Sequence, residues 1–282
     1  MVLLLRFPER PSNLRARPLS TTERVPHPGM YSLDHKVVII TGASEGIGAE
    51  LANLLRARGC QLVLAARNEA KLKAVGGEGA CIVAGDLTRE DARARVIEAA
   101  LERFGRIDVL INNAGRGLYN AVSRTRLEEA RALFELNFFA PLHLGQLAAP
   151  ALRASRGVIV NVSSIAGQIS LPWMPIYSAT KFALASLSSS QRTEMRRDGV
   201  RVLSVFPGYV DTAFQEHAAG IAPPPHIVKG RRFAVSARKC AEAIVAGIEG
   251  GKRNVVTPRA GWLLIWANRL LPGVVESRME TA

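Results

Sequence analysis

Short apolar segments alternate with longer amphipathic segments along most of the chain. The apolar segments are rich in β-branched residues, which is typical of strands buried on both faces of a sheet. These predicted strands are 36–41, 61–66, 80–84, 108–112, 157–162, 200–206 and, at an edge, 254–256. Between them apolar residues recur at helical spacing, which predicts helices at 47–58, 68–75, 89–104, 126–154, 175–197 and 237–250. Thr125 and Glu128 have the spacing of a capping box, so we expect the helix at 126–154 to start there.

Strands that each precede a helix predict an α/β fold with a doubly wound parallel sheet, covered by helices on both sides. No internal repeat and no linker rich in Pro, Gly or Ser divides residues 31–257, so we expect a single domain there. Residues 1–30 are rich in Arg and Pro without a hydrophobic period, which predicts a flexible arm. Residues 258–282 form a short, apolar C-terminal extension.

The composition narrows the class of protein. The 282 residues carry a formal net charge of +13, but Lys and Arg are spread along the chain and mixed with acids, so we expect no nucleic-acid partner. No stretch reaches the roughly 18 apolar residues that a membrane span needs. Cys60, Cys81 and Cys240 are odd in number and far apart, which fits neither a disulfide framework nor a metal cluster. We therefore expect a reduced, cytoplasmic protein without a metal site.

A glycine-rich turn joins the first predicted strand to the first predicted helix. Glycine permits a tight turn and lets the backbone approach a phosphate, and the helix N-terminus offers free N–H groups to an anion. Glycine clusters also make ordinary turns, but the position between strand and helix favours a nucleotide-phosphate site. The predicted contacts are Gly42, Ser44, Glu45, Gly46, Ile47 and Gly48.

The end of the second predicted strand indicates which nucleotide binds. A carboxylate there would bind the ribose hydroxyls of NAD, whereas this chain has Ala66 followed by Arg67, whose guanidinium can pair with a 2′-phosphate. We therefore expect NADP(H) to be favoured over NAD(H), although Arg67 could also be a surface residue before a helix that Asn68 caps. Asp86, followed by Leu87, could accept a hydrogen bond from the adenine amino group or cap the next helix.

A second group of polar residues carries candidate chemistry. Tyr177 and Lys181 are four residues apart on a predicted helix and share a face, where the ammonium would lower the pKa of the phenol. This spacing is common in helices without function, so its meaning depends on its neighbours. Ser163 and Ser164 end the fifth strand, where they could bind a substrate oxygen or simply form a turn. Asn137 lies among apolar residues of a helix, which is unusual unless its side chain is used.

Together these motifs resemble those of the short-chain dehydrogenase/reductase family, in its single-domain form. In the family's order, the chain has T-G-x-x-x-G-x-G at 41–48, N-N-A-G at 112–115, Ser164 thirteen residues before Tyr177-x-x-x-Lys181, and P-G-x-x-x-T at 207–212. One such motif is a weak signal, whereas the ordered set is specific. The resemblance covers about residues 34–257 and implies a Rossmann fold and an NAD(P)(H)-dependent alcohol or carbonyl oxidoreductase.

The resemblance also implies roles for individual residues. Tyr177 would be the acid/base for the substrate oxygen, Ser164 would polarise that oxygen, and Lys181 would hold the nicotinamide ribose and lower the pKa of Tyr177. Asn137 would hold a water that connects Lys181 to solvent, and Thr212 would hold the carboxamide of the nicotinamide. The residues implied to contact or shape the cofactor site are Asn113, Ala114, Gly115, Tyr177, Lys181, Pro207, Gly208, Val210 and Thr212.

The glycine-rich turn departs from the family pattern at one position. Members that prefer NADP(H) often carry a basic residue within this turn, where this chain has Glu45. The departure weakens the expected preference for NADP(H) without reversing it. It leaves Arg67 as the main partner of a 2′-phosphate.

The segments after the fifth and sixth strands would line the substrate pocket in such a fold. Residues 165–176 are apolar and include Trp173 and Met174, which favours a small, largely apolar substrate such as a ketone, a steroid-like or a lipid-like molecule. Residues 209–235 are rich in proline and then basic, so they form either a lid over the pocket or an ordinary loop.

Residues 260–275 of the C-terminal extension concentrate large apolar side chains. They could lie on a membrane surface, cover the pocket or be buried between subunits. Because membrane-surface helices usually have a richer basic face, we favour burial within the protein or a dimer. The resemblance implies a homo-dimer or tetramer formed through the helices at 126–154 and 175–197.

We therefore expect an oxidoreductase that transfers a hydride between NADP(H) and the carbonyl or alcohol carbon of a small, largely apolar substrate. A membrane-surface reductase of lipid metabolism is one alternative. A cofactor-binding regulator without turnover is another, but a scaffold would not need all four of Asn137, Ser164, Tyr177 and Lys181.

Overall fold

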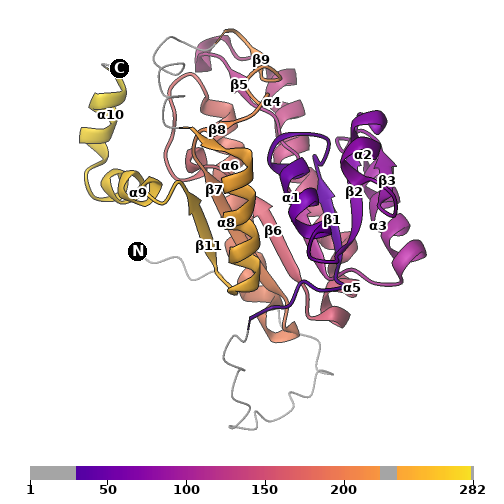
Figure 1. Ribbon diagram of the computed structural model, residues 1–282. Coiled ribbons are helices and arrows are strands. Elements are labelled where there is room, and N and C mark those ends of the chain that lie inside the picture. The colour runs from indigo at the N-terminus through magenta and orange to yellow at the C-terminus, as the bar shows by residue number, and fades with distance from the viewer. Residues whose placement is uncertain (1–29, 223–233, 281–282) are drawn as a thin grey trace, which may run out of the picture.

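Seven parallel strands form the central sheet of the computed structural model, which describes residues 30–222 and 234–280. Their order is β11-β7-β6-β4-β1-β2-β3 (Figure 1). The strands are β1 (Val37–Thr41), β2 (Gln61–Ala66), β3 (Cys81–Ala84), β4 (Val109–Asn112), β6 (Val158–Val162), β7 (Arg201–Pro207) and β11 (Asn254–Thr257). The order runs outward in both directions from β1 and β4, which confirms the doubly wound sheet.

Helices cover both faces of this sheet and create two apolar cores. One core joins α1 (Gly46–Arg56), α2 (Glu69–Gly76) and α8 (Ala237–Glu249). The other face carries α3 (Glu90–Phe104), α5 (Ala140–Ser155) and α6 (Pro175–Glu194). Alternate residues of β1 serve the two cores, because Val38 and Ile40 belong to the first and Ile39 to the second. β1 is therefore buried at every position, because it packs against helices on both faces of the sheet.

The predicted helix at 126–154 consists of two α-helices joined by a π-helical turn. It is divided into α4 (Leu127–Phe134), the π-helical residues 135–139, and α5. The capping box predicted at Thr125 and Glu128 is wrong by one residue. The Thr125 hydroxyl donates to the Ala121 carbonyl (2.9 Å) and closes the preceding turn, while the Glu129 carboxylate accepts from the Arg126 N–H (3.2 Å). Thr125 is thus already used by the 3₁₀ turn that precedes the helix.

Two short strand pairs shape the loops above the carboxyl edge of the sheet. β5 (Leu118–Tyr119) pairs with β9 (Ala219–Gly220), and β8 (Val210–Asp211) pairs with β10 (Val235–Ser236). The β5–β9 pair draws the segment after β7 toward the segment after β4, and the β8–β10 pair joins the two ends of the segment between β7 and α8. Residues 223–233, which belong to the predicted lid, lie outside the described residues, as does the predicted arm except for Met30.

The C-terminal extension forms α9 (Gly261–Leu270) and α10 (Pro272–Glu280), which lie beside β11 at the side of the molecule (Figure 1). Ile265 is buried in a small core with Ile169, Phe206 and Val256. The large apolar side chains that remain exposed are Leu263, Leu264, Trp266, Leu270, Leu271 and Val274. Burial of the extension within the protein is therefore only partial. Within residues 30–222 and 234–280, no helix is long and apolar enough to cross a membrane.

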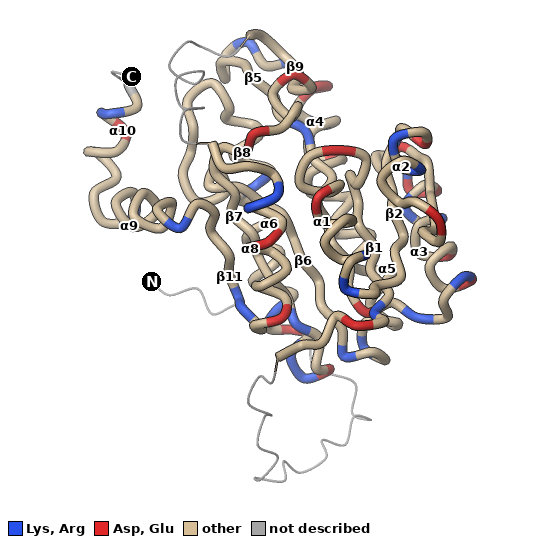
Figure 2. The backbone as a smooth tube through the Cα atoms, in the orientation of Figure 1, with Lys and Arg blue, Asp and Glu red and all other residues tan. Residues whose placement is uncertain are grey.

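The charged residues show no block of one sign in the described part of the chain. Figure 2 shows Lys and Arg interleaved with Asp and Glu over most elements. Many of these residues form ion pairs with each other, such as Arg95 with Asp91 and Arg238 with Glu242. The excess positive charge is thus distributed over the surface.

Candidate active site

The glycine-rich turn packs so closely that its glycines have no room for side chains. Gly42 has a φ of +64°, and a Cβ there would lie 2.9 Å from the Ala114 Cα atom. A Cβ on Gly48 would collide with the carbonyl oxygen of Gly42 and lie 2.7 Å from Asn113 Nδ2. Beside the turn, a Cβ on Gly46 would approach Thr212 Cγ2 to 3.1 Å. Glycine thus lets the backbone form a cradle at the N-terminus of α1, and such a cradle suits a diphosphate.

Hydrogen bonds from the end of β4 hold this cradle in place. Asn113 Nδ2 donates to the carbonyls of Thr41 (2.9 Å) and Gly42 (3.2 Å). The Thr41 hydroxyl accepts from the N–H groups of Asn113 and Ala114, each at 3.0 Å. Asn113 therefore shapes the predicted cofactor site through the backbone of the turn.

Glu45 precedes the first residue of α1, and its side chain is bound away from the helix end. Glu45 Oε2 lies 2.9 Å from Lys71 Nζ, and Oε1 lies 2.7 Å from His217 Nδ1. Burial raises the pKa of Glu45, but the hydrogen bonds and positive charges of Lys71 and His217 outweigh this effect and hold the pKa below its usual value. The carboxylate is therefore a charge-compensated group, and the first N–H groups of α1 receive no cap from its side chain.

The end of β2 leaves Arg67 exposed next to the glycine-rich turn. The N–H groups of Gly42 (2.7 Å) and Ala43 (3.3 Å) both donate to the Ala65 carbonyl, which joins the two segments. The next residue, Asn68, caps α2 by accepting from the Lys71 N–H at 3.0 Å. Arg67 is thus free of the capping role and lies at the sheet edge where the sequence predicted a 2′-phosphate.

Asp86 follows β3 at the same edge of the sheet. Its carboxylate accepts from the Thr88 N–H at 3.0 Å, while α3 begins only at Glu90. Asp86 therefore stabilises the loop before α3 and is exposed at its rim, whereas Leu87 is buried in the second core. One carboxylate oxygen already serves the loop, and a carboxylate can accept further hydrogen bonds, such as one from an adenine amino group.

Tyr177 and Ser164 meet above the end of β6. Tyr177 is 7% exposed, and its side chain is hydrogen-bonded to that of Ser164. Burial raises the pKa of Tyr177 to about 12, although the Ser164 hydrogen bond acts in the opposite direction. Ser163 faces elsewhere, because its hydroxyl donates to the Lys181 carbonyl at 2.8 Å. Of the two serines, only Ser164 is thus placed beside the phenol.

Lys181 lies one helical turn beyond Tyr177 on α6 and is 4% exposed. Its ammonium donates to the Val162 carbonyl at 2.9 Å and lies 5.8 Å from the centre of the Tyr177 ring. Burial lowers the pKa of Lys181 to about 8. The group therefore still carries its proton at pH 7 and places a positive charge next to the phenol.

Asn137 occupies the middle of the π-helical turn and is completely buried. Its Oδ1 accepts from the Arg116 N–H, and its Nδ2 donates to the Arg116 carbonyl, each at 3.0 Å. Nδ2 also donates to the Thr180 hydroxyl at 3.1 Å. A Cβ on Gly115 would lie within 3.3 Å of both Asn137 Oδ1 and Lys181 Nζ, so Gly115 allows these groups to approach each other.

The segment after β7 connects the Tyr177 side of the site to the glycine-rich turn. The Ser164 hydroxyl donates to the Pro207 carbonyl at 3.3 Å, and the Gly208 N–H donates to the Thr257 carbonyl at 2.8 Å. Val210 then pairs with Val235, and Thr212 reaches Gly46. The structure thus brings the sequence-predicted residues from eight different segments to one edge of the sheet.

Three neighbours of this group escaped the sequence analysis. Thr180 donates to the Tyr177 carbonyl (2.7 Å) and accepts from Asn137, and Phe214 packs on the Tyr177 ring with the ring centres 5.7 Å apart. Lys71 is the third. Thr180 could have been suspected from its place between Tyr177 and Lys181, but no local signal marks Phe214 or Lys71.

An apolar cluster forms the wall beside the phenol. Its buried members are Leu118, Tyr119, Leu133, Ala166, Met174 and Tyr177. Leu171, Ile176 and Phe214 pack against it. The site thus combines a polar group of residues at the sheet edge with an apolar wall, as small-molecule sites commonly do.

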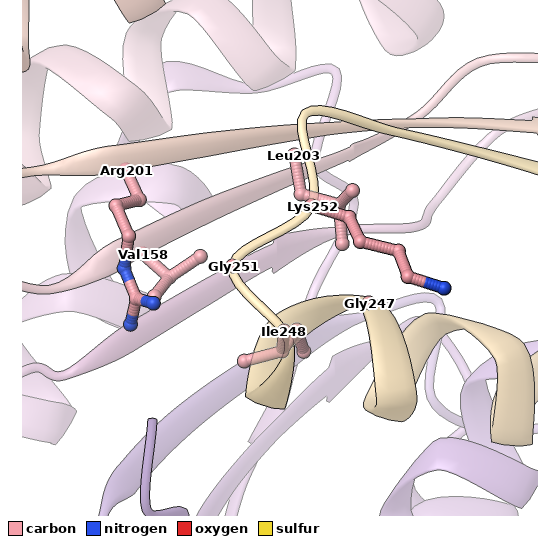
Figure 3. Close-up of a pocket in the computed structure, with 7 residues that line it drawn as sticks. All are labelled: Val158, Arg201, Leu203, Gly247, Ile248, Gly251 and Lys252. Atoms are coloured by element: carbon pink, nitrogen blue, oxygen red, sulfur yellow. The ribbon is translucent and has the colours of Figure 1, made fainter. Parts of the chain in front are cut away.

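A separate cavity at the opposite end of the sheet is too small to be a ligand site (Figure 3). It lies beneath the turn after α8 and is bordered by Val158 and Arg201, the first residues of β6 and β7. Its volume of about 10 Å³ would hold at most about one water molecule.

The fold and the site define a nucleotide-binding protein of the doubly wound class. Residues 36–220 match the family model of the short chain dehydrogenases, and the chain belongs to this family. It is an NAD(P)-dependent oxidoreductase.

Relatives and solved structures agree with this assignment. The chain is 32% identical over 256 residues to the 11-beta-hydroxysteroid dehydrogenase-like 4A of Arabidopsis thaliana, covering 86% of this chain and 83% of the relative. It is similar to a short chain dehydrogenase from Burkholderia cenocepacia in complex with NADP, at 30% identity and a TM-score of 0.76, covering 88% of this chain and 99% of the other. A short chain dehydrogenase/reductase from Burkholderia phymatum in complex with NAD has the same fold, at 24% identity and a TM-score of 0.80, covering 87% and 96%.

The packing of Gly48 predicts that alanine at this position disrupts the cradle. The added Cβ must push on the Gly42 carbonyl and on Asn113, so we expect Gly48→Ala to weaken binding of NADPH and NADH by about 10- to 100-fold. Fluorescence titration of the two nucleotides measures this. Gly273→Ala is the control, because a Cβ on Gly273 has no neighbour within 4 Å. Wild-type affinity in Gly48→Ala would show that the turn does not hold the nucleotide.

Proposed function

We propose that the protein reduces the carbonyl group of a small, largely apolar substrate with NADPH, or oxidises the matching alcohol with NADP. The observation that carries this proposal is the placement of Tyr177 beside Ser164 and the buried Lys181 ammonium, against an apolar wall. A proton donor, a hydrogen-bonding hydroxyl and a fixed positive charge are what a carbonyl oxygen needs when it gains negative charge. The complete set also disfavours a regulator without turnover.

Tyr177, Ser164 and Lys181 have different roles at the substrate oxygen. The bound dihydronicotinamide supplies the hydride for the carbonyl carbon. Tyr177 donates its proton to the oxygen, and Ser164 holds and polarises that oxygen. The Lys181 ammonium stabilises the phenolate that remains on Tyr177. The high pKa of Tyr177, about 12, keeps the phenol protonated at neutral pH and therefore ready to act as an acid.

The cofactor site has the components that a nicotinamide nucleotide requires. The cradle of Gly42, Gly46 and Gly48 would hold the diphosphate, and Lys181 would hold the nicotinamide ribose. Thr212, next to the turn, would bind the carboxamide, and Asp86 and Leu87 would border the adenine. Asn137 would hold a water that passes protons between Lys181 and solvent, although its amide nitrogen is already used by Arg116 and Thr180.

The preference for NADP(H) rests on charge at the carboxyl end of β2. Arg67 follows Ala66 at a position where a carboxylate would repel a 2′-phosphate. Glu45 does not oppose this preference, since Lys71 and His217 compensate its charge. The similarity to a family member solved with NADP supports the same choice.

An apolar substrate is favoured by the residues around the phenol. Met174 is buried in the wall, and Trp173 is held with a φ of +64° by the turn before α6. The Trp173 carbonyl accepts from the Asn120 N–H at 2.8 Å, which fixes this turn to the segment after β5. A positive φ is unfavourable for a large side chain and recurs at functional sites. A ketone with an alicyclic, aromatic or alkyl body would fit such a wall.

The pKa values predict how reduction depends on pH. Lys181 loses its proton as the pH rises through about 8, and the phenolate on Tyr177 then loses its stabilising charge. We therefore expect kcat for ketone reduction to be level near pH 6–7 and to fall above about pH 8. In Lys181→Met we expect a much lower kcat at every pH, and no decline of kcat above about pH 8. A pH–rate profile with a panel of apolar ketones measures both effects.

Tyr177→Phe serves as the blank for this panel, with an expected loss of about 10²- to 10⁴-fold in kcat. Tyr31→Phe is its matched control, since the Tyr31 hydroxyl contacts the Asp108 carbonyl, away from the site. Turnover retained in Tyr177→Phe would contradict the assignment of the acid.

Arg67→Ala tests the choice of nucleotide. If the guanidinium pairs with the 2′-phosphate, its loss should weaken NADPH binding by about 10- to 100-fold and leave NADH binding within about 3-fold of wild type. Titrations of both nucleotides at fixed ionic strength measure the ratio. Arg56→Ala, an exposed arginine at the end of α1, is the control. Equal losses for both nucleotides would place Arg67 outside the specificity site.

The exposed side of the helix at 126–154 supports a homo-dimer or tetramer. Leu127, Phe134 and Phe139 border an open groove there, and Leu127 and Phe139 are exposed. A second copy that packed its own α4 and α5 against this groove would cover these side chains. Light scattering of the purified chain tests the oligomeric state.

A reductase that acts at a membrane surface is a second candidate, favoured by the exposed apolar residues of α9 and α10. Soluble monomers rarely expose so many large apolar side chains in one segment, and Leu263 and Leu270 are 75% and 72% exposed. We expect the chain to float with vesicles of phosphatidylcholine and phosphatidylglycerol. A double variant, Leu263→Glu with Leu270→Glu, should abolish flotation. Val122→Glu, an equally exposed site elsewhere, should not. Failure of the wild type to float would remove this candidate.

A further inference from the structure

Arg93 is a buried cation that none of the roles above uses. It lies on α3 and is 3% exposed. Burial of a guanidinium is unfavourable unless its N–H donors are hydrogen-bonded and its charge is paired. The contacts of Arg93 must therefore offset the cost of burying it. Arg95, two residues later on the same helix, is exposed and pairs with Asp91. The two arginines therefore have different surroundings.

The guanidinium of Arg93 joins two segments that are distant in the sequence. Its Nε donates to the Arg89 carbonyl (3.2 Å) and its Nη2 to the Thr88 carbonyl (2.8 Å), which fixes the loop that carries Asp86 and Leu87. On the other side, Nη2 lies 2.5 Å from Glu135 Oε1, and Nη1 donates to the Phe139 carbonyl at 3.4 Å.

Glu135 and Phe139 are the first and last residues of the π-helical turn. Arg93 thus holds both ends of this turn from outside the helix. π-helical turns are rare, less stable than α-helix and frequent at functional sites, so an external contact at each end is a means to maintain one. Asn137 lies at the centre of the turn.

A return of this turn to α-helix would displace Asn137. Each residue of a helix is rotated by about 100° from the previous one, so a change of register by one residue turns the side chain far from its present direction. The amide would then lose its hydrogen bonds to the Arg116 backbone and the Thr180 hydroxyl.

We infer that Arg93, paired with Glu135, is a positioning residue: it maintains the π-helical turn that holds Asn137 in the site and ties this turn to the loop at Asp86. The expected effect of Arg93 on turnover rests on the proposed function, in which Asn137 serves proton transfer through Lys181. The maintenance of the π-helical turn by Arg93 is independent of the proposed function.

A double-mutant cycle tests the inference. Arg93→Met keeps much of the apolar stem and removes the donors, and we expect kcat to fall by about 10- to 100-fold with a smaller change in KM. In an Asn137→Ala background the same substitution should change kcat by less than about 3-fold, because the side chain that Arg93 positions is already absent. Arg95→Met is the matched control and should leave kcat unchanged. Equal losses in both backgrounds would reduce Arg93 to a general structural role and overturn the inference.

Hydrogen exchange separates this inference from the proposed function. Peptides that cover residues 135–141 should exchange faster in Arg93→Met than in wild type or in Arg95→Met, whether or not Asn137 takes part in turnover. Glu135→Gln removes the ion pair with little change in shape, so it gives the same test if Arg93→Met does not fold. If Asn137→Ala retains full kcat, the proposed role of Asn137 fails. If exchange at 135–141 is unchanged in Arg93→Met and Glu135→Gln, the inference about Arg93 fails.

Discussion

A buried ammonium sets the requirements for the elements around the active site. The Lys181 side chain is almost completely removed from water, and an unpartnered charge in that position would destabilise the fold by several kcal/mol. The Val162 carbonyl at the end of β6 offsets part of this, which requires α6 to approach the strand closely. Gly167 permits the approach, since a Cβ there would lie 2.6 Å from the Lys181 carbonyl oxygen and collide with Ser163 Oγ. Residues without a proposed chemical role thus fix the positive charge beside the Tyr177 phenol.

The parallel arrangement of the strands explains why the site is assembled from so many segments. β4, β6 and β7 are parallel neighbours, so their carboxyl ends meet at one edge and deliver Asn113, Ser164 and Pro207 together. Backbone carbonyls released at the strand ends then serve as acceptors for side chains, as Pro207 does for Ser164 and Thr41 does for Asn113. The site is therefore a consequence of where the strands stop.

The local sequence pattern predicted the features that depend on neighbouring residues alone, such as the positions of the strands and the residues that share a helix face. Each strand of the sheet begins within one residue of its prediction, because these strands are mostly apolar and both faces of the sheet are covered. Tyr177 and Lys181 share a face because they are four residues apart on α6. The thirteen-residue spacing to Tyr177 already favoured Ser164 over Ser163. The structure adds a physical reason, since the Ser163 hydroxyl donates to the Lys181 carbonyl while Ser164 lies beside the phenol.

Features that depend on distant partners could not be predicted in this way. The π-helical turn has the same apolar spacing as the helix around it, and the contacts at its two ends come from Arg93 on another helix. Thr125 was assigned to the wrong turn because its hydroxyl fits either the end of one turn or the start of the next. The exposure of Leu263 and Leu270 follows from where α9 leaves the sheet, and the sequence shows only that they are apolar.

Charge compensation explains how Glu45 would be compatible with the phosphorylated nucleotide of the proposed function. An uncompensated carboxylate in the glycine-rich turn would repel a 2′-phosphate by about 1 kcal/mol at 4 Å in water, and by more where solvent is excluded. Lys71 from α2 and His217 from the segment after β8 contact different oxygens of this carboxylate, and they hold its pKa low. The Lys71 charge neutralises Glu45, and Arg67 adds a second positive charge at the same edge of the sheet. With the charge of Glu45 compensated, Arg67 would need no further base within the turn to attract the 2′-phosphate of the proposed nucleotide.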